Sequence, residues 1–271
     1  MRRFNAFFIA GLFSLLFTAC KKEIQSTINS NPDLADIAAA QKSITSQSKK
    51  LVLETFTHTI GNFSRQYQFA YAPNGNVDSI VVSDNSLHYS YNVFYKGSRI
   101  DSVHLVQSGK IVSSITNFQY KGNLITGFDY FDRLISFPIS THYAITYDQQ
   151  KRISTIDQLF GNTITDHKIF TYNAIGDLIA WNETGFSKHT TYTNDEKLNP
   201  LHFIPDLFAI MFEEPWTWEY ILSMHNITST TYLNGPTVTY QNQYNNADQL
   251  VSKVFTDINS NQVNTFTFTY Q

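Results

Sequence analysis

Gln66-Tyr67-Gln68-Phe69-Ala70-Tyr71 is the stretch that decides the fold, together with the turn Pro73-Asn74-Gly75-Asn76 and the new apolar residue Val77. Its aromatic side chains take alternate positions, which places them on one face of a β-strand and the polar side chains on the other. Gly and Asn accept the positive φ angles that tight reversals need. The stretch therefore predicts a strand with an aromatic face, a tight turn, and a second strand that begins at Val77.

The same unit recurs along the chain. A tyrosine returns about every 25 residues, each time before a turn and a new apolar run, at Tyr71, Tyr95, Tyr120, Tyr147, Tyr172, Tyr192, Tyr244 and Tyr270. A second series of turns lies midway between these, at Gly61-Asn62, Asp84-Asn85, Ser108-Gly109, Gly161-Asn162, Asn234-Gly235 and Asn259-Ser260-Asn261. This spacing predicts an up-and-down meander of roughly 15 strands, each of about 7 to 10 residues. Sheets of that size usually curl or close on themselves.

One stretch, from Asn199 to Pro215, breaks the period and is apolar almost all round. Pro205 is suited to start a helix and Pro215 to stop it, although Glu213 and Glu214 oppose the helix dipole at its end. A short helix without a polar face must be buried, so we expect it to lie against the aromatic face of the sheet. The predicted fold class is all-β: a curled up-and-down antiparallel sheet of hairpin repeats with one short apolar helical insertion.

The first part of the chain has a different composition. Residues 1–19 carry Arg2 and Arg3 before an apolar run and predict an export signal, and the run ends at Cys20, the only cysteine of the chain. Residues 20–48 are rich in Ser, Asn, Gln, Ala and Lys, which predicts a flexible tether, with one possible short helix after Asn31. Residues 49–271 form the predicted β repeat domain.

Two resemblances extend these predictions. Phe17-Thr18-Ala19-Cys20 resembles the lipobox of bacterial lipoproteins, which implies acylation of Cys20 and a cell-envelope location, with the outer membrane favoured and the periplasmic or surface face left open. Tyr147-Asp148 before Arg152-Ile153, and Tyr172-Asn173 before Gly176-Asp177-Leu178, are similar to the YD repeats of the RHS family. The whole chain resembles uncharacterised Bacteroidota-type lipoproteins with YD-like repeats, and this resemblance implies only the repeat fold.

Charge limits the classes of partner. Loss of Arg2 and Arg3 with the signal lowers the formal net charge from −3 to −5, and no Lys or Arg cluster is present. Nucleic acids and anionic lipid surfaces both need such clusters, so neither is an expected partner. The expected partners are a membrane, through the N-terminal lipid anchor, and a glycan or an envelope protein.

No catalytic motif is present in the sequence, and no cofactor or metal is expected. The histidines show no spacing that pairs two imidazoles on one metal. The carboxylate clusters Asp129/Asp132, Asp195/Glu196 and Glu213/Glu214 are interpreted as solvated loop charges, with an acid and base pair as the alternative.

The most attractive ligand candidates are Trp216, Trp218 and Tyr220, which alternate with Thr217 and Glu219. On a strand they would share one face, and sugar rings stack on such platforms. The competing interpretation is that these rings cover the apolar insertion as core.

Three functional hypotheses follow from these patterns. The first is a non-enzymatic envelope lipoprotein that acts as a scaffold or binding module for protein or glycan. The second is a secreted-type carbohydrate-active hydrolase that uses an Asp/Glu pair. The third is an outer-membrane β-barrel, since alternating strands of about 10 residues also suit lipid.

Overall fold

The computed structural model describes residues 52–133, 139–184, 188–204, 206–214, 218–257 and 261–271. These residues form one antiparallel sheet, with two short helices outside it. The strands are β1 Leu53–Ile60, β2 Phe63–Tyr71, β3 Val77–Ser83, β4 His88–Lys96, β5 Arg99–Gln107, β6 Lys110–Lys121, β7 Leu124–Asp132, β8 Ile139–Tyr147, β9 Ile153–Phe160, β10 Thr163–Tyr172, β11 Leu178–Glu183, β12 Lys188–Leu198, β13 His225–Tyr232, β14 Thr237–Thr239, β15 Gln241–Tyr244, β16 Leu250–Thr256 and β17 Val263–Tyr270. The predicted signal, Cys20 and the predicted tether with its short helix lie outside the described residues.

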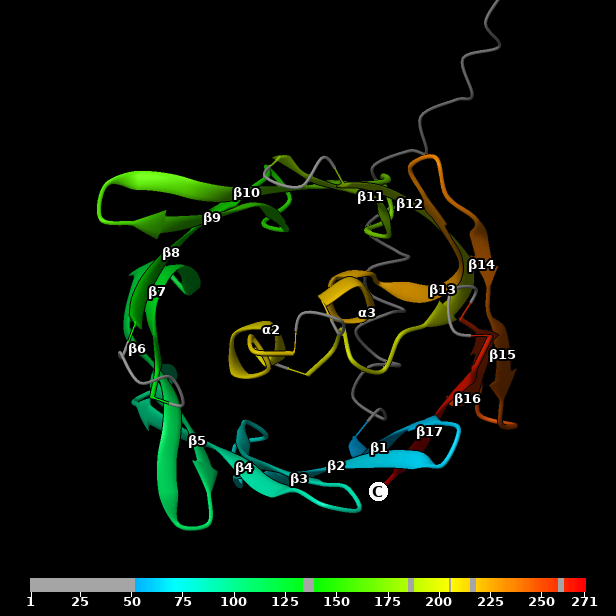
Figure 1. Cartoon of the computed structure of the whole chain (residues 1–271), viewed down its shortest axis with the longest axis horizontal. Helices are drawn as coiled ribbons and strands as arrows, with labels where there is room; N and C mark the ends of the chain where they lie inside the picture. The colour runs from blue at the N-terminus through cyan, green and yellow to red at the C-terminus, as the bar shows by residue number, and fades with distance from the viewer. Residues whose placement is uncertain (1–51, 134–138, 185–187, 205, 215–217, 258–260) are drawn as a thin grey trace, which may run out of the picture.

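The sheet is a nearly closed, barrel-like ring (Figure 1). Strands that are consecutive in the chain pair antiparallel, and β1 pairs with both β2 and β17, which joins the two ends of the repeat domain. The one irregular place is at Tyr240, between β14 and β15, where β14 pairs with β13 and β15 pairs with β16. The all-β, up-and-down prediction is therefore confirmed, and the curl that sheet size predicts has gone almost to closure.

The two faces of the sheet differ as the alternation predicts. Phe56 lies opposite Tyr67 on one side and Phe268 on the other, and all three rings are buried inside the ring. Its neighbour Thr57 lies opposite Gln66 and Thr267, on the outer face. Burial of the aromatic and aliphatic set contributes about 25 cal/mol per Å² of apolar surface, so the barrel interior is the hydrophobic core.

The repeat tyrosines line one end of the barrel, which we call the tyrosine end. Each ends the second strand of a hairpin, and its hydroxyl donates to the backbone carbonyl at the start of the first strand: Tyr71 to Leu53 (2.9 Å), Tyr95 to Val77 (3.0 Å), Tyr120 to Ile100 (2.8 Å), Tyr147 to Ile125 (2.7 Å), Tyr172 to Ile153 (2.9 Å) and Tyr270 to Leu250 (2.6 Å). Each bond contributes about 0.5–1.5 kcal/mol. The tyrosine spacing is therefore the spacing of hairpins that are each locked at one end.

A register shift accompanies each tyrosine. Tyr71 pairs with Val77, and the shift between Ala70 and Tyr71 marks a β-bulge. Strict alternation from Val77 would place Ser79 and Val81 on the inward face. Because of the bulge, the inward residues are instead Ile80 and Val82. The glycines of four turns that follow the repeat tyrosines, Gly75, Gly97, Gly122 and Gly176, have positive φ angles, as tight reversals need.

Tyr192 departs from this pattern. Its strand β12 continues to Leu198, and the amide of Asn194 takes over the lock by donating to the carbonyl of Leu178 at 3.0 Å. The Tyr192 hydroxyl instead donates to Oε2 of Glu219, inside the barrel, at 2.9 Å.

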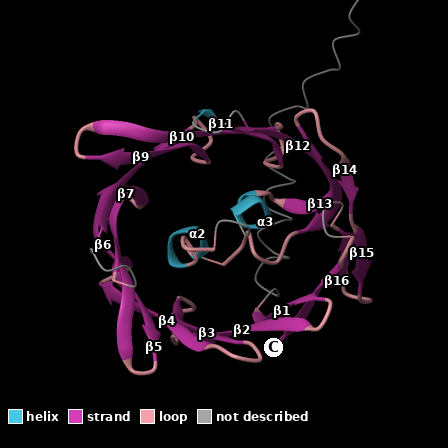
Figure 2. Ribbon diagram, in the orientation of Figure 1, coloured by secondary structure: helices cyan, strands magenta, loops and turns pink. Residues whose placement is uncertain are grey.

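The apolar insertion enters the barrel from the tyrosine end and fills its middle, where Figure 2 shows both helices inside the ring. Helix α2 covers Leu207–Ile210 and α3 covers Trp218–Leu222. The predicted burial of the insertion inside the curled sheet is confirmed. The prediction of a single helix from Pro205 to Pro215 is wrong, because α2 has only four residues. Both prolines lie outside the described residues. Among the residues that the structure describes, no helix has the length and hydropathy needed to cross a membrane.

Candidate functional site

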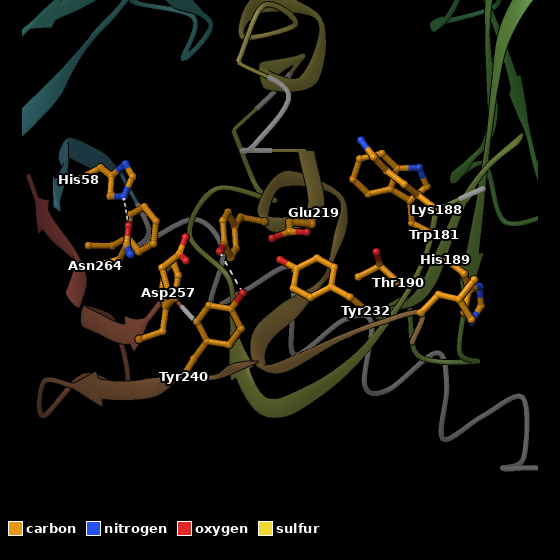
Figure 3. Close-up of a pocket in the computed structure, with 14 residues that line it drawn as sticks. His58, Trp181, Lys188, His189, Thr190, Glu219, Tyr232, Tyr240, Asp257 and Asn264 are labelled. Atoms are coloured by element: carbon orange, nitrogen blue, oxygen red, sulfur yellow. Dashed lines mark hydrogen bonds between the residues drawn. The ribbon is translucent and has the colours of Figure 1, made fainter. Parts of the chain in front are cut away.

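The candidate site is a cavity of about 600 Å³ inside the end of the barrel opposite the tyrosines, which we call the distal end (Figure 3). The insertion enters from the tyrosine end, so it leaves this mouth less filled. Strand ends near the distal turns supply the walls, and α3 supplies the floor. The lining residues are His58, Trp181, Lys188, His189, Thr190, Glu219, Tyr220, Tyr232, Leu233, Tyr240, Phe255, Asp257, Asn264 and Phe266.

Aromatic rings make up much of the cavity wall. Tyr220, Tyr240 and Phe255 form a continuous group, with the ring centres of Tyr220 and Tyr240 at 6.3 Å and those of Tyr240 and Phe255 at 4.9 Å. The Tyr240 hydroxyl lies 2.9 Å from the Thr230 hydroxyl and 3.4 Å from that of Tyr220. Fixed ring faces of this kind offer a stacking surface to a ligand.

Polar groups stand between the rings. Nε2 of His58 lies 3.0 Å from Oδ1 of Asn264, and the imidazole stacks on Phe266 with ring centres 4.3 Å apart. Burial lowers the pKa of His58, which favours its neutral form. On the opposite wall, Nε1 of Trp181 is buried and has no hydrogen-bond partner among the described residues. The cavity wall thus combines aromatic rings with an imidazole and a side-chain amide.

Glu219 and Lys253 are two buried titratable groups that influence each other electrostatically near the cavity floor. Glu219 accepts from Tyr192, and burial raises the pKa of its carboxyl. Lys253 lies on β16 below the cavity, with its ammonium nitrogen 4.7 Å from the ring centre of Tyr220 and 5.0 Å from that of Tyr240. Burial lowers the pKa of Lys253 to about 7, while Glu219 and Asp195 oppose this shift.

The predicted ligand residues divide into two groups. Trp216 lies outside the described residues, as does Cys20. Trp218 and Tyr220 belong to helix α3, so the strand expected there is wrong at both positions. Trp218 is 4 % exposed and packs against Phe208 and Phe212, so it is core, as the competing interpretation had it. Tyr220 is also buried, but one edge of it lines the cavity.

The interpretation of Glu213 and Glu214 as solvated loop charges is wrong. Oε1 of Glu214 accepts from the hydroxyls of Tyr89 (2.8 Å) and Tyr91 (3.3 Å) and lies 3.8 Å from the guanidinium of Arg65. Glu213 accepts from Ser113 on β6. Burial raises the pKa of Glu213 to about 7, against the lowering effect of the Ser113 bond. The insertion carries both carboxyls inside the barrel, where water is scarce.

The other predicted carboxylate clusters do not come together as pairs. Asp129 on β7 lies 2.7 Å from Nδ1 of His142 and accepts from Asn117 on the neighbouring strand β6, while Asp195 accepts from Asn242 at 3.1 Å and from Tyr244. Within the described ranges, no three His, Cys, Asp or Glu side chains gather in a way that would hold a metal ion.

Sequence reasoning missed Tyr240, Glu219 and Lys253. A signal for Lys253 exists in the repeat: counted from the first apolar residue of its unit, Leu250, it occupies the inward position held by Phe56 after Leu53 and by Ile80 after Val77. A lysine at a position that is otherwise apolar marks a buried amine, but only the bulge register reveals the correspondence.

Comparison with known proteins gives a likeness of fold. No family model matches the chain, and no curated protein matches it. Among solved structures, a porin-like protein from Bacteroides uniformis ATCC 8492 aligns with a TM-score of 0.57 at 14% identity, over 81% of this chain and 98% of that chain. A porin-like protein from Bacteroides vulgatus ATCC 8482 aligns with a TM-score of 0.38 at 11% identity, over the same shares. The first of these alignments supports the barrel-like all-β fold.

Proposed function

We propose that this chain is a cell-envelope lipoprotein, acylated at Cys20, whose barrel is a non-enzymatic binding module with its ligand site in the distal cavity. The observation that carries the proposal is the distribution of apolar and polar side chains between the inside and the outside of the barrel. Its interior is an apolar core filled by the insertion, and its outer face carries residues such as Thr57, Gln66 and Thr267. A binding module needs this arrangement, because a packed core keeps its sheet rigid and polar side chains keep its outer face hydrated.

The same polarity argues against the outer-membrane β-barrel hypothesis. A barrel that spans a lipid bilayer presents an apolar band outward and, in porins, a polar lumen. Here the alternation runs the other way on β1, β2 and β17, and the insertion occupies the lumen. The neighbour with a porin-like name shares the fold at low identity, so its name does not transfer a channel function to this chain.

A glycan is the ligand class that we favour for the cavity. Sugar rings pack their apolar faces on aromatic side chains and use hydroxyls to bond acids, amides and ring nitrogens. The cavity is lined by the ring of Tyr232 together with Glu219 and Asn264. A cavity of about 600 Å³ falls within the ordinary range for small-ligand sites.

Binding tests the cavity assignment directly. The mature chain, residues 20–271, is screened against immobilised oligosaccharides, and Tyr232→Ala is compared with Phe94→Ala. Both side chains are aromatic and similarly exposed, at 45% and 47%, but Phe94 points to the outer face and does not line the cavity. We expect Tyr232→Ala to weaken binding about tenfold or more and Phe94→Ala to leave it unchanged. Equal effects of the two substitutions, or no glycan retained, would overturn the assignment.

Mass spectrometry of the mature N-terminus tests the anchor. We expect the first residue to be Cys20 with the mass of attached acyl chains, because small residues precede the only cysteine of the chain. An unmodified chain that begins at another residue would contradict the lipoprotein proposal.

The hydrolase hypothesis keeps one observation in its favour. Glu213, with its pKa raised to about 7 by burial, neighbours Glu214, which is held by Arg65 and two tyrosines. A protonated acid beside a hydrogen-bonded carboxylate is the division of roles that glycosidases use. Hydrolysis of an oligosaccharide by the pure protein, lost in Glu213→Gln, would favour this function over the binding module.

A further inference from the structure

Most of the exposed large apolar side chains of the described residues lie at the distal end of the barrel. Val52, Phe94, Ile175 and Ile179 lie elsewhere, near the tyrosine end. Apart from Tyr232, which lines the distal cavity, the rest lie within three residues of a distal turn. We call the following the distal tips: Phe63, Leu87, Ile111, Phe160, Ile164, Leu233 and Val263.

The distal tips come from separate hairpins that are spread around the ring. They are contributed by the β1–β2, β3–β4, β5–β6, β9–β10, β13–β14 and β16–β17 connections. The β5–β6 and β9–β10 hairpins flare outward from the ring in Figure 1. Phe160 is 69% exposed and Ile164 is 54% exposed on either side of one turn, so their apolar surface is available to a partner.

We propose that the distal end docks on a lipid bilayer, with the tips inserted among the lipids. The tips are spread over six hairpin turns around the ring and share those turns with Gly, Asn, Asp and Ser, so their apolar surface is divided among the turns. A fluid bilayer can accommodate separate apolar side chains at any spacing. A folded protein partner would instead need a surface whose shape is complementary to the whole distal end. This occupant therefore fits the pattern of the tips.

The length of the chain before β1 allows this orientation. The inference rests here on the proposed anchor at Cys20, and β1 begins at the tyrosine end, away from the tips. Strands of 8 to 10 residues give the barrel wall a height of about 30 Å. The residues between Cys20 and Leu53 span up to about 100 Å when fully extended, so an anchored chain can reach past the wall.

Charge specifies the kind of lipid. The mature chain carries a formal net charge of −5 after loss of Arg2 and Arg3, which disfavours a strongly anionic surface. The expected surface is therefore zwitterionic, and insertion is driven by the apolar tips. Docking by this end would also turn the mouth of the distal cavity toward the membrane.

Co-flotation with vesicles tests the proposal. The mature chain carries Cys20→Ser, so that no acyl chain contributes, and it is mixed with vesicles of phosphatidylcholine and phosphatidylethanolamine. The tip variant is Phe160→Ser/Ile164→Ser, and the matched control is Phe94→Ser/Ile175→Ser, with similarly exposed side chains near the tyrosine end. We expect the tip variant to lower the vesicle partition coefficient about tenfold or more and the control to leave it unchanged.

A site-specific readout makes the result independent of folding defects. Phe160→Trp should be quenched by vesicles of brominated phosphatidylcholine, while Phe94→Trp should show only the quenching of the parent chain. Absence of flotation, equal losses in the two double variants, or tip-dependent dimerisation seen by sedimentation without vesicle binding would each overturn the proposal. Because acylation is removed here and glycan binding is measured separately, failure of this docking is distinguishable from failure of the proposed function.

Discussion

Replacement of Lys253 by methionine should stabilise the protein, and most strongly at neutral and lower pH. Lys253 is 3% exposed, and burial lowers the pKa of its amine from 10.5 to about 7. In the unfolded chain the amine keeps its ordinary pKa, so folding between these two pH values releases a proton. A shift of this size corresponds to about 4 to 5 kcal/mol of folding free energy.

The sign follows from which state binds the proton. Below pH 7 the ammonium must be buried, so the penalty is fully present; it shrinks as pH rises and vanishes above pH 10.5, where both states hold a neutral amine. Methionine fills a similar volume without the charge but loses the contacts with the rings of Tyr220 and Tyr240, which are worth about 0.5–2 kcal/mol. Lys253→Met should therefore add about 2–4 kcal/mol at neutral pH and about zero at the alkaline end.

Urea unfolding followed by tryptophan fluorescence, between about pH 6 and about pH 10.5, measures the difference between parent and variant. Parent and variant contain the same tyrosines and the same Glu213, so the pH dependence of stability that these groups contribute cancels in the difference. Lys110→Met is the control because that lysine is exposed, and we expect it to change stability by less than about 0.5 kcal/mol. A gain for Lys253→Met that does not vary with pH, or a loss at neutral pH, would refute the reasoning from burial.

Three further predictions concern the hydrogen bond of a repeat tyrosine, the packing of Trp218 in the core and the buried carboxyl of Glu213. Tyr71→Phe removes the bond to the Leu53 carbonyl and should cost about 0.5–1.5 kcal/mol in urea unfolding, with no change in the sheet by circular dichroism. Trp218→Ala should cost about 3–5 kcal/mol, since its ring fills the core; a loss below about 1 kcal/mol would show that it is not packed there. Glu213 binds a proton more tightly in the folded state, so its contribution is present below pH 4.5 and lost as pH rises through about 7. Parent stability should therefore decline over this window, and Glu213→Gln should remove that decline; profiles of equal slope would contradict it.

The repeat could be predicted in detail because it depends on local chemistry. Alternation in Gln66-Tyr67-Gln68-Phe69 fixes a strand and its two faces, and glycines such as Gly75 and Gly176 fix the reversals through their positive φ angles. These signals lie within a few residues of each other, so no tertiary information is needed to interpret them. The anchor at Cys20 and the glycan ligand remain predictions, since they depend on partners outside the chain.

The tertiary structure decided where the inside of the barrel lies and what shares it. Lys253 lies over the ring of Tyr220 and feels the charge of Glu219 only because closure of the sheet brings β16 and α3, which are distant in sequence, close together. Trp218 became core and Glu214 became a buried acceptor for the same reason: closure by the pairing of β1 with β17 turned one face of a sheet into an interior with little water. Periodicity in a sequence assigns a side chain to a face of a strand, but the dielectric and the neighbours on that face are set by the closure of the sheet.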